Sequence, residues 1–321
     1  HSMLQDDPVD GAIVFDNKAR DNQWSTDDNW NIRRQPKIED VPVVIRANAN
    51  ITGEYAVSGV VLENSHLTIT NKGGLTVGAG GITGAADNGS SITIQNYSTI
   101  DKYKDERPFG AGYLRIHPSV KEEDMPRVTV NYVTKSQPSE TPGKENSNDD
   151  RLWQYFGAPG NNTTITISNH TWIYKWEKEW EEKTGKFNLE PFEGYAITQK
   201  DMPSYTWTTT PINQNHKVSL LKGYNIFANS YLAPLNVAAF KETDFEEENV
   251  GDIHRTFYIF NTGSWSSWNQ AATTDNNNHA ITTTQSEGQY TAIPVASARN
   301  LDQTTDPTTI APMQGIYVYS T

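Results

Sequence analysis

The chain of 321 residues contains no cysteine. This absence excludes disulfides, thiol nucleophiles and thiolate metal sites. It also contains no apolar run near the length of about 20 residues that a membrane-spanning helix needs, so we predict no transmembrane segment. Long stretches with helical periodicity are missing as well, because apolar residues alternate with Thr, Ser, Asn and charged residues. Such alternation is typical of strands with one face in water.

Positive charge is scarce relative to negative charge. The chain has 26 Lys and Arg against 39 Asp and Glu, a formal net charge of -13. A surface of this sign repels a phosphate backbone, and no stripe of Lys and Arg interrupts it, so we expect no nucleic-acid partner. Aromatic residues are plentiful instead, with 9 Trp, 15 Tyr and 10 Phe, and they can fill a core.

Short alternating segments recur between residues 43 and 100, with Asn, Gly and Ser between them. Each segment is too short for an ordinary hairpin strand, and the intervening residues suit chain reversals. Stacked coils of a parallel β-solenoid have this pattern, because each coil buries one apolar row against its neighbours. Residues 113–116 and 128–133 continue it. The recurring segments are Val-Val-Ile at 43–45, Val-Val-Leu at 60–62, Leu-Thr-Ile at 67–69, Leu-Thr-Val at 75–77 and Ile-Thr-Ile at 92–94.

The chain is long enough for two domains of ordinary size, and a polar stretch marks the boundary between them. Residues 136–150 contain almost no apolar side chain, which predicts an exposed loop or linker. We therefore predict an all-β protein with a short β-solenoid-like domain over residues 4–135. An antiparallel, jelly-roll-like β-sandwich follows it over residues 151–321. Residues 1–3 resemble the remnant of a cleaved tag.

Two segments leave their local structure open between helix and strand. Residues 237–250 are compatible with a short helix. Between Trp172 and Lys186, aromatic residues alternate with other residues, which favours a strand pair with a hairpin turn at 183–186 over a helix. On a strand, Glu177 and Glu179 would share one face. Lysines interleave with these acids, so we expect the cluster at 177–182 to be solvated at an exposed hairpin tip.

Several motifs follow one another in an order that resembles a known family. Trp24 and Trp30 precede an apolar stretch at 40–51 and the Gly-Gly-Leu-Thr-Val segment at 73–77, and further motifs lie at 152–159, 174–177, 187–197, 223–235 and 310–318. In this order they resemble the extracellular, multidomain proteins that Bacteroidetes bacteria export. The chain departs from the family pattern at Ser230, where the family prefers Pro.

That resemblance implies a secreted β protein, or one anchored to the outer-membrane surface of a Gram-negative bacterium. It carries no family-wide catalytic residues over to this chain. Residues 315–321 read as a strand that stops abruptly, so we expect the sequence to be a piece of a longer exported protein with further domains.

The residues themselves form no recognisable catalytic motif. In the repeated segments Glu54, Glu63 and Asp87 fall in different turns, whereas glycoside hydrolysis needs two carboxyl groups at one bond. The histidines lack the spacing of metal ligands, and no Gly-x-Ser-x-Gly is present. We predict no catalytic residue and no cofactor. Calcium, as a structural ion, is the one metal with candidate ligands, which are Asp16, Asp21, Asp27 and Asp28.

Tryptophans supply the one serious hint of a ligand. Trp172, Trp176 and Trp180 lie close in sequence, and Trp265 and Trp268 form a second group. Sugar rings present flat C–H faces that stack on such indoles. The same residues can also fill a core, because Trp carries the largest apolar surface. For any one of them, core packing is the favoured interpretation.

Three hypotheses of function compete. The leading one is a non-catalytic extracellular or cell-surface module, structural or adhesive, within a larger exported protein. The second is a carbohydrate-binding module that uses the five tryptophans. The third is a β-solenoid enzyme that degrades polysaccharides. The expected partners are glycans, host or cell-surface proteins, and other domains of the same chain.

Overall fold

The computed structural model describes residues 11–85, 89–97, 110–133, 154–167, 171–199, 204–261, 272–274, 280–282, 289–301 and 308–321. Strands dominate these ranges, and the prediction of an all-β protein is confirmed. The helices are α2 (Val295–Arg299) and the 3-10 turns η2 (Asp27–Asn29), η3 (Glu122–Asp124), η5 (Val237–Ala239) and η6 (Glu242–Asp244). None of the helices in the described part is long and apolar enough to cross a membrane.

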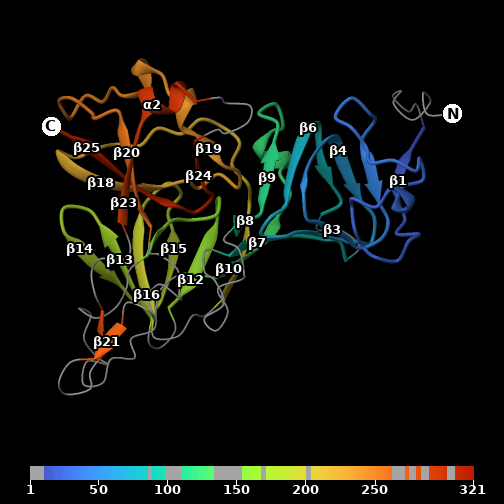
Figure 1. The fold of residues 1–321 in the computed structure, drawn as a ribbon, viewed down its shortest axis with the longest axis horizontal. Coiled ribbons are helices and arrows are strands. Elements are labelled where there is room, and N and C mark those ends of the chain that lie inside the picture. Colours follow the sequence, from blue (N-terminus) through green and yellow to red (C-terminus); the bar gives the residue numbers. More distant parts are fainter. Residues whose placement is uncertain are drawn as a thin grey trace.

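The N-terminal part alternates between two parallel sheets, which lie at the blue-to-green end of the ribbon in Figure 1. From β2 onward, each strand of the first sheet is followed along the chain by a strand of the second, and we call each such pair of strands a coil. The first sheet runs β1 (Ile13–Phe15), β2 (Val43–Ile45), β4 (Glu54–Leu62), β6 (Gly74–Thr83) and β9 (Tyr113–Ile116). The second runs β3 (Ala49–Ile51), β5 (His66–Ile69), β7 (Ser91–Tyr97) and β10 (Val128–Val133), and β8 (Gly110–Ala111) pairs with β7.

Buried apolar side chains stack in register through these coils. In the second sheet Ile51 pairs with Ile69, and Ile69 pairs with Ile94. Each of these side chains is at most 1% exposed. Parallel strands lie about 4.8 Å apart, so like side chains meet directly above one another. Close stacking also requires glycine at position 74, because a Cβ there would lie 2.0 Å from the Tyr113 ring of the next coil.

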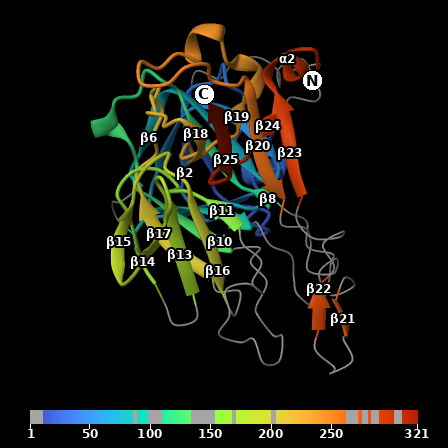
Figure 2. The ribbon, with the colours of Figure 1, turned by 90° about the vertical axis from the view of Figure 1, so that its left-hand side faces the viewer.

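The C-terminal part consists of small antiparallel sheets. One has the order β11 (Gln154–Phe156), β16 (Tyr195–Gln199), β13 (Thr171–Trp176) and β14 (Trp180–Lys183). Another has the order β18 (Gly223–Ala228), β25 (Gly315–Ser320), β20 (Thr256–Asn261) and β23 (Gln289–Pro294), and Figure 2 shows it above the β13–β14 hairpin. Three strand pairs complete this part: β12 (Thr163–Thr166) with β15 (Lys186–Leu189), β19 (Leu235–Asn236) with β24 (Thr309–Ile310), and β21 (Ala272–Thr274) with β22 (Ala280–Thr282).

The two parts share a sheet and a core. Strand β17 (Ser204–Thr209) pairs antiparallel with β10, so a strand from beyond residue 200 extends the second parallel sheet. The Asn96 amide donates to the carbonyl of Pro312 at 3.1 Å, and the Leu114 N–H donates to that of Leu232 at 2.8 Å. One apolar cluster runs continuously from the coils into the C-terminal sheets. The predicted linker at 136–150 lies outside the described residues.

One local prediction is corrected. The hairpin turn lies at Glu177–Glu179 rather than at 183–186, because the cross-strand indoles of Trp176 and Trp180 pack 5.2 Å apart and fix the register. Residues 183–186 instead lead to β15, which pairs with β12. Residues 237–250, which are compatible with a short helix, contain the 3-10 turns η5 and η6, and Val237 and Phe245 pack in a second apolar cluster.

The stacked rows generate a stability prediction. Ile94 is 1% exposed, so Ile94→Ala should lower the free energy of unfolding by about 2–5 kcal/mol, the cost of a cavity in a close-packed row. Thr93→Ala is the matched control, because Thr93 faces outward on the same strand and should change it by about 0.5 kcal/mol or less. Urea denaturation of the two variants measures both. Equal losses would contradict the inward assignment of Ile94.

Candidate functional site: an aromatic groove

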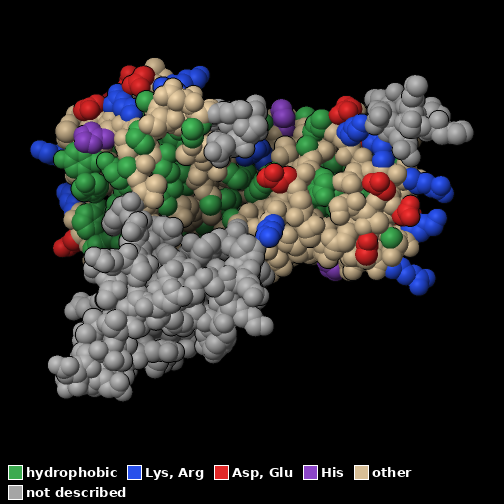
Figure 3. Space-filling model, in the orientation of Figure 1, with side chains coloured by type: hydrophobic (Ala, Val, Ile, Leu, Met, Phe, Trp, Pro, Cys, Tyr) green, Lys and Arg blue, Asp and Glu red, His purple; other side chains and the backbone are tan. Residues whose placement is uncertain are grey.

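Exposed large hydrophobic side chains gather at one place. Among the described residues five such side chains are exposed, and three of them, Trp180, Leu221 and Tyr224, surround the contact between the β13–β14 hairpin and β18. Their exposed fractions are 39%, 44% and 56%. Figure 3 shows hydrophobic side chains collected over β18 and β25 at this end of the molecule. Contiguous exposed apolar surface of this kind marks binding sites more often than scattered single residues do.

The hairpin positions two tryptophans side by side. Trp176 and Trp180 are directly opposite each other in the β13–β14 register, and their rings meet edge to face. The Trp176 indole N–H donates to the Tyr224 carbonyl at 3.0 Å, which ties the hairpin to strand β18. Tyr155 stacks on the other side of Trp180 at 6.2 Å. The indoles are therefore held by neighbours on two sheets.

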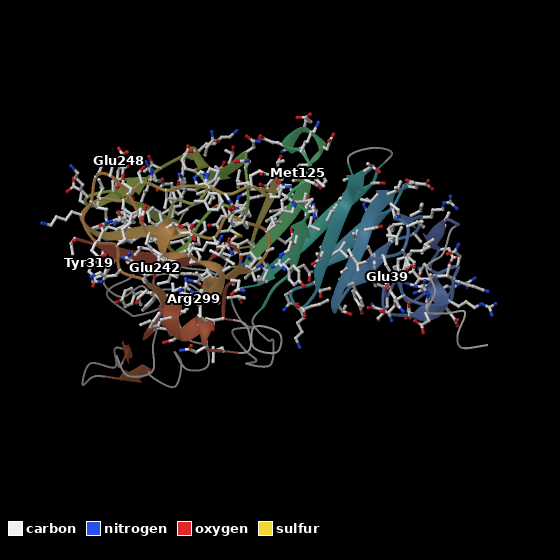
Figure 4. All side chains as sticks on the ribbon, turned by 90° about the horizontal axis from the view of Figure 1, so that it is seen from above. Glu39, Met125, Glu242, Glu248, Arg299 and Tyr319 are labelled. Atoms are coloured by element: carbon white, nitrogen blue, oxygen red, sulfur yellow. The ribbon has the colours of Figure 1, made fainter. Side chains whose placement is uncertain are left out.

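Strands β18 and β25 continue the aromatic surface. Tyr224 and Tyr319 are cross-strand partners with ring centroids 4.9 Å apart, and the His254 ring lies 4.7 Å from Tyr319. Alternation along the strands sends Phe227 and Val318 to the opposite face, where the second apolar cluster lies. Figure 4 places Tyr319 at the end of the molecule opposite to Glu39. One face of this sheet thus packs a core while the other presents aromatic rings.

A groove opens between the hairpin and β18, and we call it the aromatic groove. Its volume is about 560 Å³, and its walls come from residues 175–181, Glu193, Ser219, Leu221 and residues 225–227. Sites for small ligands fall between about 300 and 1,000 Å³ and combine apolar walls with a few polar groups. Size and lining therefore suit a small ligand or one unit of a polymer.

The groove carries an excess of negative charge. Four carboxylates line it, those of Glu177, Glu179, Glu181 and Glu193, against the two ammonium groups of Lys175 and Lys178. Lys175 pairs with Glu177 at 3.3 Å, and Glu181 pairs with Lys183 at 3.6 Å. The half-buried Glu193 carboxylate has no hydrogen bond or ion pair within the described part of the chain. A cation in the groove would meet uncompensated carboxylates.

Tyr195 is buried near the groove, and carboxylates of the groove act on the pKa of its hydroxyl. It is 1% exposed, and its hydroxyl accepts a hydrogen bond from the Glu190 N–H at 2.9 Å. Burial raises the pKa of the Tyr195 hydroxyl to about 12, and the charges of Glu190, Glu193 and Glu177 act in the same direction. The hydrogen bond from Glu190 opposes this rise. A carboxylate repels the phenolate that deprotonation would create, so these acids make the neighbourhood electronegative.

The structure brings together only some of the residues named from the sequence. Trp176 and Trp180 meet at the groove, whereas Trp172 is half-buried on the same face of β13 and does not line it. Trp265 and Trp268 lie outside the described residues. Glu177 and Glu179 lie in the exposed turn of the hairpin, as expected for a solvated tip, and therefore share no strand face.

Sequence reasoning missed Leu221, Tyr224 and Glu193. Alternation places Tyr224 on the face opposite Phe227, but it does not say which face another sheet covers. In the sequence Glu193 shares a short stretch with one other acid, Glu190, and its position at the groove arises from the bridge between residues 193 and 227. No local signal identifies it.

The calcium candidates lie in one loop at the far end of the molecule but do not form a cluster. Asp21 accepts hydrogen bonds from the Thr26 hydroxyl at 2.6 Å, the Gln23 N–H at 2.9 Å and the Asn29 amide at 2.6 Å. These bonds lower the pKa of the Asp21 carboxyl, and the Thr26 hydroxyl has the largest effect. Asp16 accepts from the Lys18 N–H, and Asp27 from the Gln35 amide. No group of three potential metal ligands occurs in the ranges that the structure describes, and the calcium site, with Asp28 as its fourth candidate, stays a prediction.

Comparisons of the chain with protein-family models, with curated proteins and with solved structures give no match.

Alkaline titration tests the environment of Tyr195. The folded protein holds its phenol proton up to about pH 12, and the unfolded chain loses it near pH 10. Stability from this group is therefore complete below pH 10 and declines between pH 10 and 12, by on the order of 2 kcal/mol. Tyr195→Phe should cost about 1 kcal/mol at neutral pH through the lost acceptor and should remove this part of the alkaline decline. Urea denaturation at several pH values compares the two proteins, and parallel declines would contradict the assignment.

Proposed function

We propose that this chain is a non-catalytic adhesion module of a secreted or surface-anchored protein, and that it binds carbohydrate in the aromatic groove. The observation that carries the proposal is that two exposed hydrophobic side chains, Trp180 and Leu221, line one groove next to the exposed Tyr224, whose carbonyl holds Trp176. Sugar rings stack their C–H faces on indole and phenol rings, whose large apolar faces are well suited to this contact. Trp176 is held by its hydrogen bond to Tyr224, so it meets a ligand without losing side-chain freedom.

The architecture we propose is a short β-solenoid followed by a jelly-roll-like antiparallel region. Alternate strands in two parallel sheets with rows of buried side chains in register support the first half of that description. The antiparallel sheets after residue 154 support the second half, although they are divided into several small pieces. Folds of this type display surface along their sheets, as adhesion requires.

Export by a Bacteroidetes-type bacterium is part of the same proposal. The motifs that carry the resemblance contact one another, which supports a shared structural role. Gly157 donates its N–H to the Met313 carbonyl, and the Gly194 N–H donates to that of Ile226 at 3.1 Å. Strand β18 of the 223–235 motif pairs along its length with β25 of the 310–318 motif.

A binding role also suits the acids of the groove better than catalysis does. Acid–base hydrolysis of a glycoside needs two carboxyl groups that converge on one bond. Glu177, Glu179 and Glu181 are exposed, and two of them are already paired with lysines. This arrangement favours a fixed negative field over proton transfer.

A glycan array followed by titration of the best ligand tests the proposal. Trp180→Ala should weaken binding about 5- to 20-fold, because it removes a stacking surface worth about 1–2 kcal/mol. Ile38→Ala is the matched control, since Ile38 is also an exposed hydrophobic residue but lies in the N-terminal part. No glycan bound, or equal loss in both variants, would refute carbohydrate binding in the groove. Release of reducing ends from a bound polysaccharide would refute the non-catalytic role.

A further inference from the structure

The aromatic groove is lined by more carboxylates than ammonium groups. We propose that it binds saccharides that carry free amino groups, with the sugar ring stacked on Trp180 and the ammonium group at Glu193. This inference rests on the proposed function and adds the chemical class of the ligand. Four carboxylates against two ammonium groups line the groove, and the net charge of the whole chain is -13. Both repel an anionic polysaccharide and attract a cationic one.

Glu193 is the residue best placed to receive the ammonium group. It lies at the edge of β18, where residue 193 bridges Phe227. Flanking backbone hydrogen bonds hold it there, from the Gly194 N–H to the Ile226 carbonyl at 3.1 Å and from the Ala228 N–H to the Phe192 carbonyl at 3.0 Å. The close approach requires glycine at 194, because a Cβ there would lie 2.3 Å from the Ile226 side chain. The backbone that carries this side chain is thus held in place, and its carboxylate has no partner in the described chain.

The lysines of the groove leave this carboxylate uncompensated. The Lys175 side chain is 17% exposed and pairs with Glu177 in the turn that follows its strand. Lys178 is exposed at the tip of the turn, and no ion pair to Glu193 is present in the structure. The indole faces of Trp176 and Trp180 add a second attraction, since a cation close to an aromatic face is stabilised by the ring quadrupole.

A basic peptide has the same charge but fits the groove less well. An extended peptide gains most of its affinity by adding a strand to a free sheet edge. At β18 much of that edge is already paired, because the Tyr224 carbonyl accepts from Trp176 and the Ile226 carbonyl from Gly194. A ring that stacks on indoles needs no such backbone partners. The geometry therefore favours a saccharide.

Calorimetric titration with three matched probes tests the inference. The probes are a glucosamine hexasaccharide, its fully N-acetylated counterpart and a hexalysine peptide, each at a pH where the amines are protonated. We expect the glucosamine oligomer to bind about tenfold more tightly than the acetylated one, the effect of one charge-assisted contact. The difference should shrink as the salt concentration rises. Hexalysine should bind more weakly than the glucosamine oligomer.

Charge-neutralising variants locate the effect. Glu193→Gln should remove most of the preference for the amino sugar, because it should weaken binding of the glucosamine oligomer far more than binding of the acetylated one. Glu63→Gln removes the same charge from an exposed ion pair with Arg46 in the N-terminal part and should leave the preference intact. Trp180→Ala should weaken both sugars alike.

The outcomes separate the inference from the proposed function. Equal affinity for both sugars with loss in Trp180→Ala would overturn the charge preference and leave carbohydrate binding standing. Hexalysine bound as tightly as the glucosamine oligomer would also overturn it, because the groove would then recognise charge alone. Binding of neither sugar, nor of any glycan on the array, would overturn both.

Discussion

Parallel strands stacked in register leave unpaired backbone groups at both ends of the stack, and much of this chain is arranged to cover them. At the first end, residues 22–31 fold back over both sheets. Phe15 of β1 bridges Trp30, and the Trp24 N–H donates to the Asn50 carbonyl of β3 at 3.0 Å. Trp24 and Trp30 are at most 1% exposed and close this end as an apolar lid.

The C-terminal part covers the other end. Strand β17 pairs with the last strand of one sheet, and the Leu232 carbonyl accepts from the last strand of the other. One apolar cluster consequently runs through both parts, and a second lies within the C-terminal part. The aromatic groove lies well away from this junction, on sheets whose other faces are buried. A rigid scaffold behind the groove suits a binding site that must hold flat rings at fixed angles.

Much of the fold was readable from the sequence because its cause is local. Alternation with period 2 gives strands, and short apolar triplets such as those at 67–69 and 92–94 stack when turn residues separate them. Both segments became neighbouring strands of one sheet. The predicted turn at 183–186 is wrong although Gly185 suits a turn. The packing of Trp176 on Trp180 across the strands stabilises a turn at 177–179 instead. Local turn preference is weaker than a cross-strand aromatic pair.

The sequence by itself determined the strand content, the inward rows of the coils and the negative charge, since each depends on residue type and spacing. Only the tertiary structure decided which aromatic residues are exposed. Alternation assigns Trp180 and Tyr224 to a face of a strand, but whether another sheet covers that face depends on contacts between distant segments. The same holds for Glu193, which reaches the groove through its bridge to Phe227. Long-range pairing of the backbone, and not local pattern, therefore assembles the site.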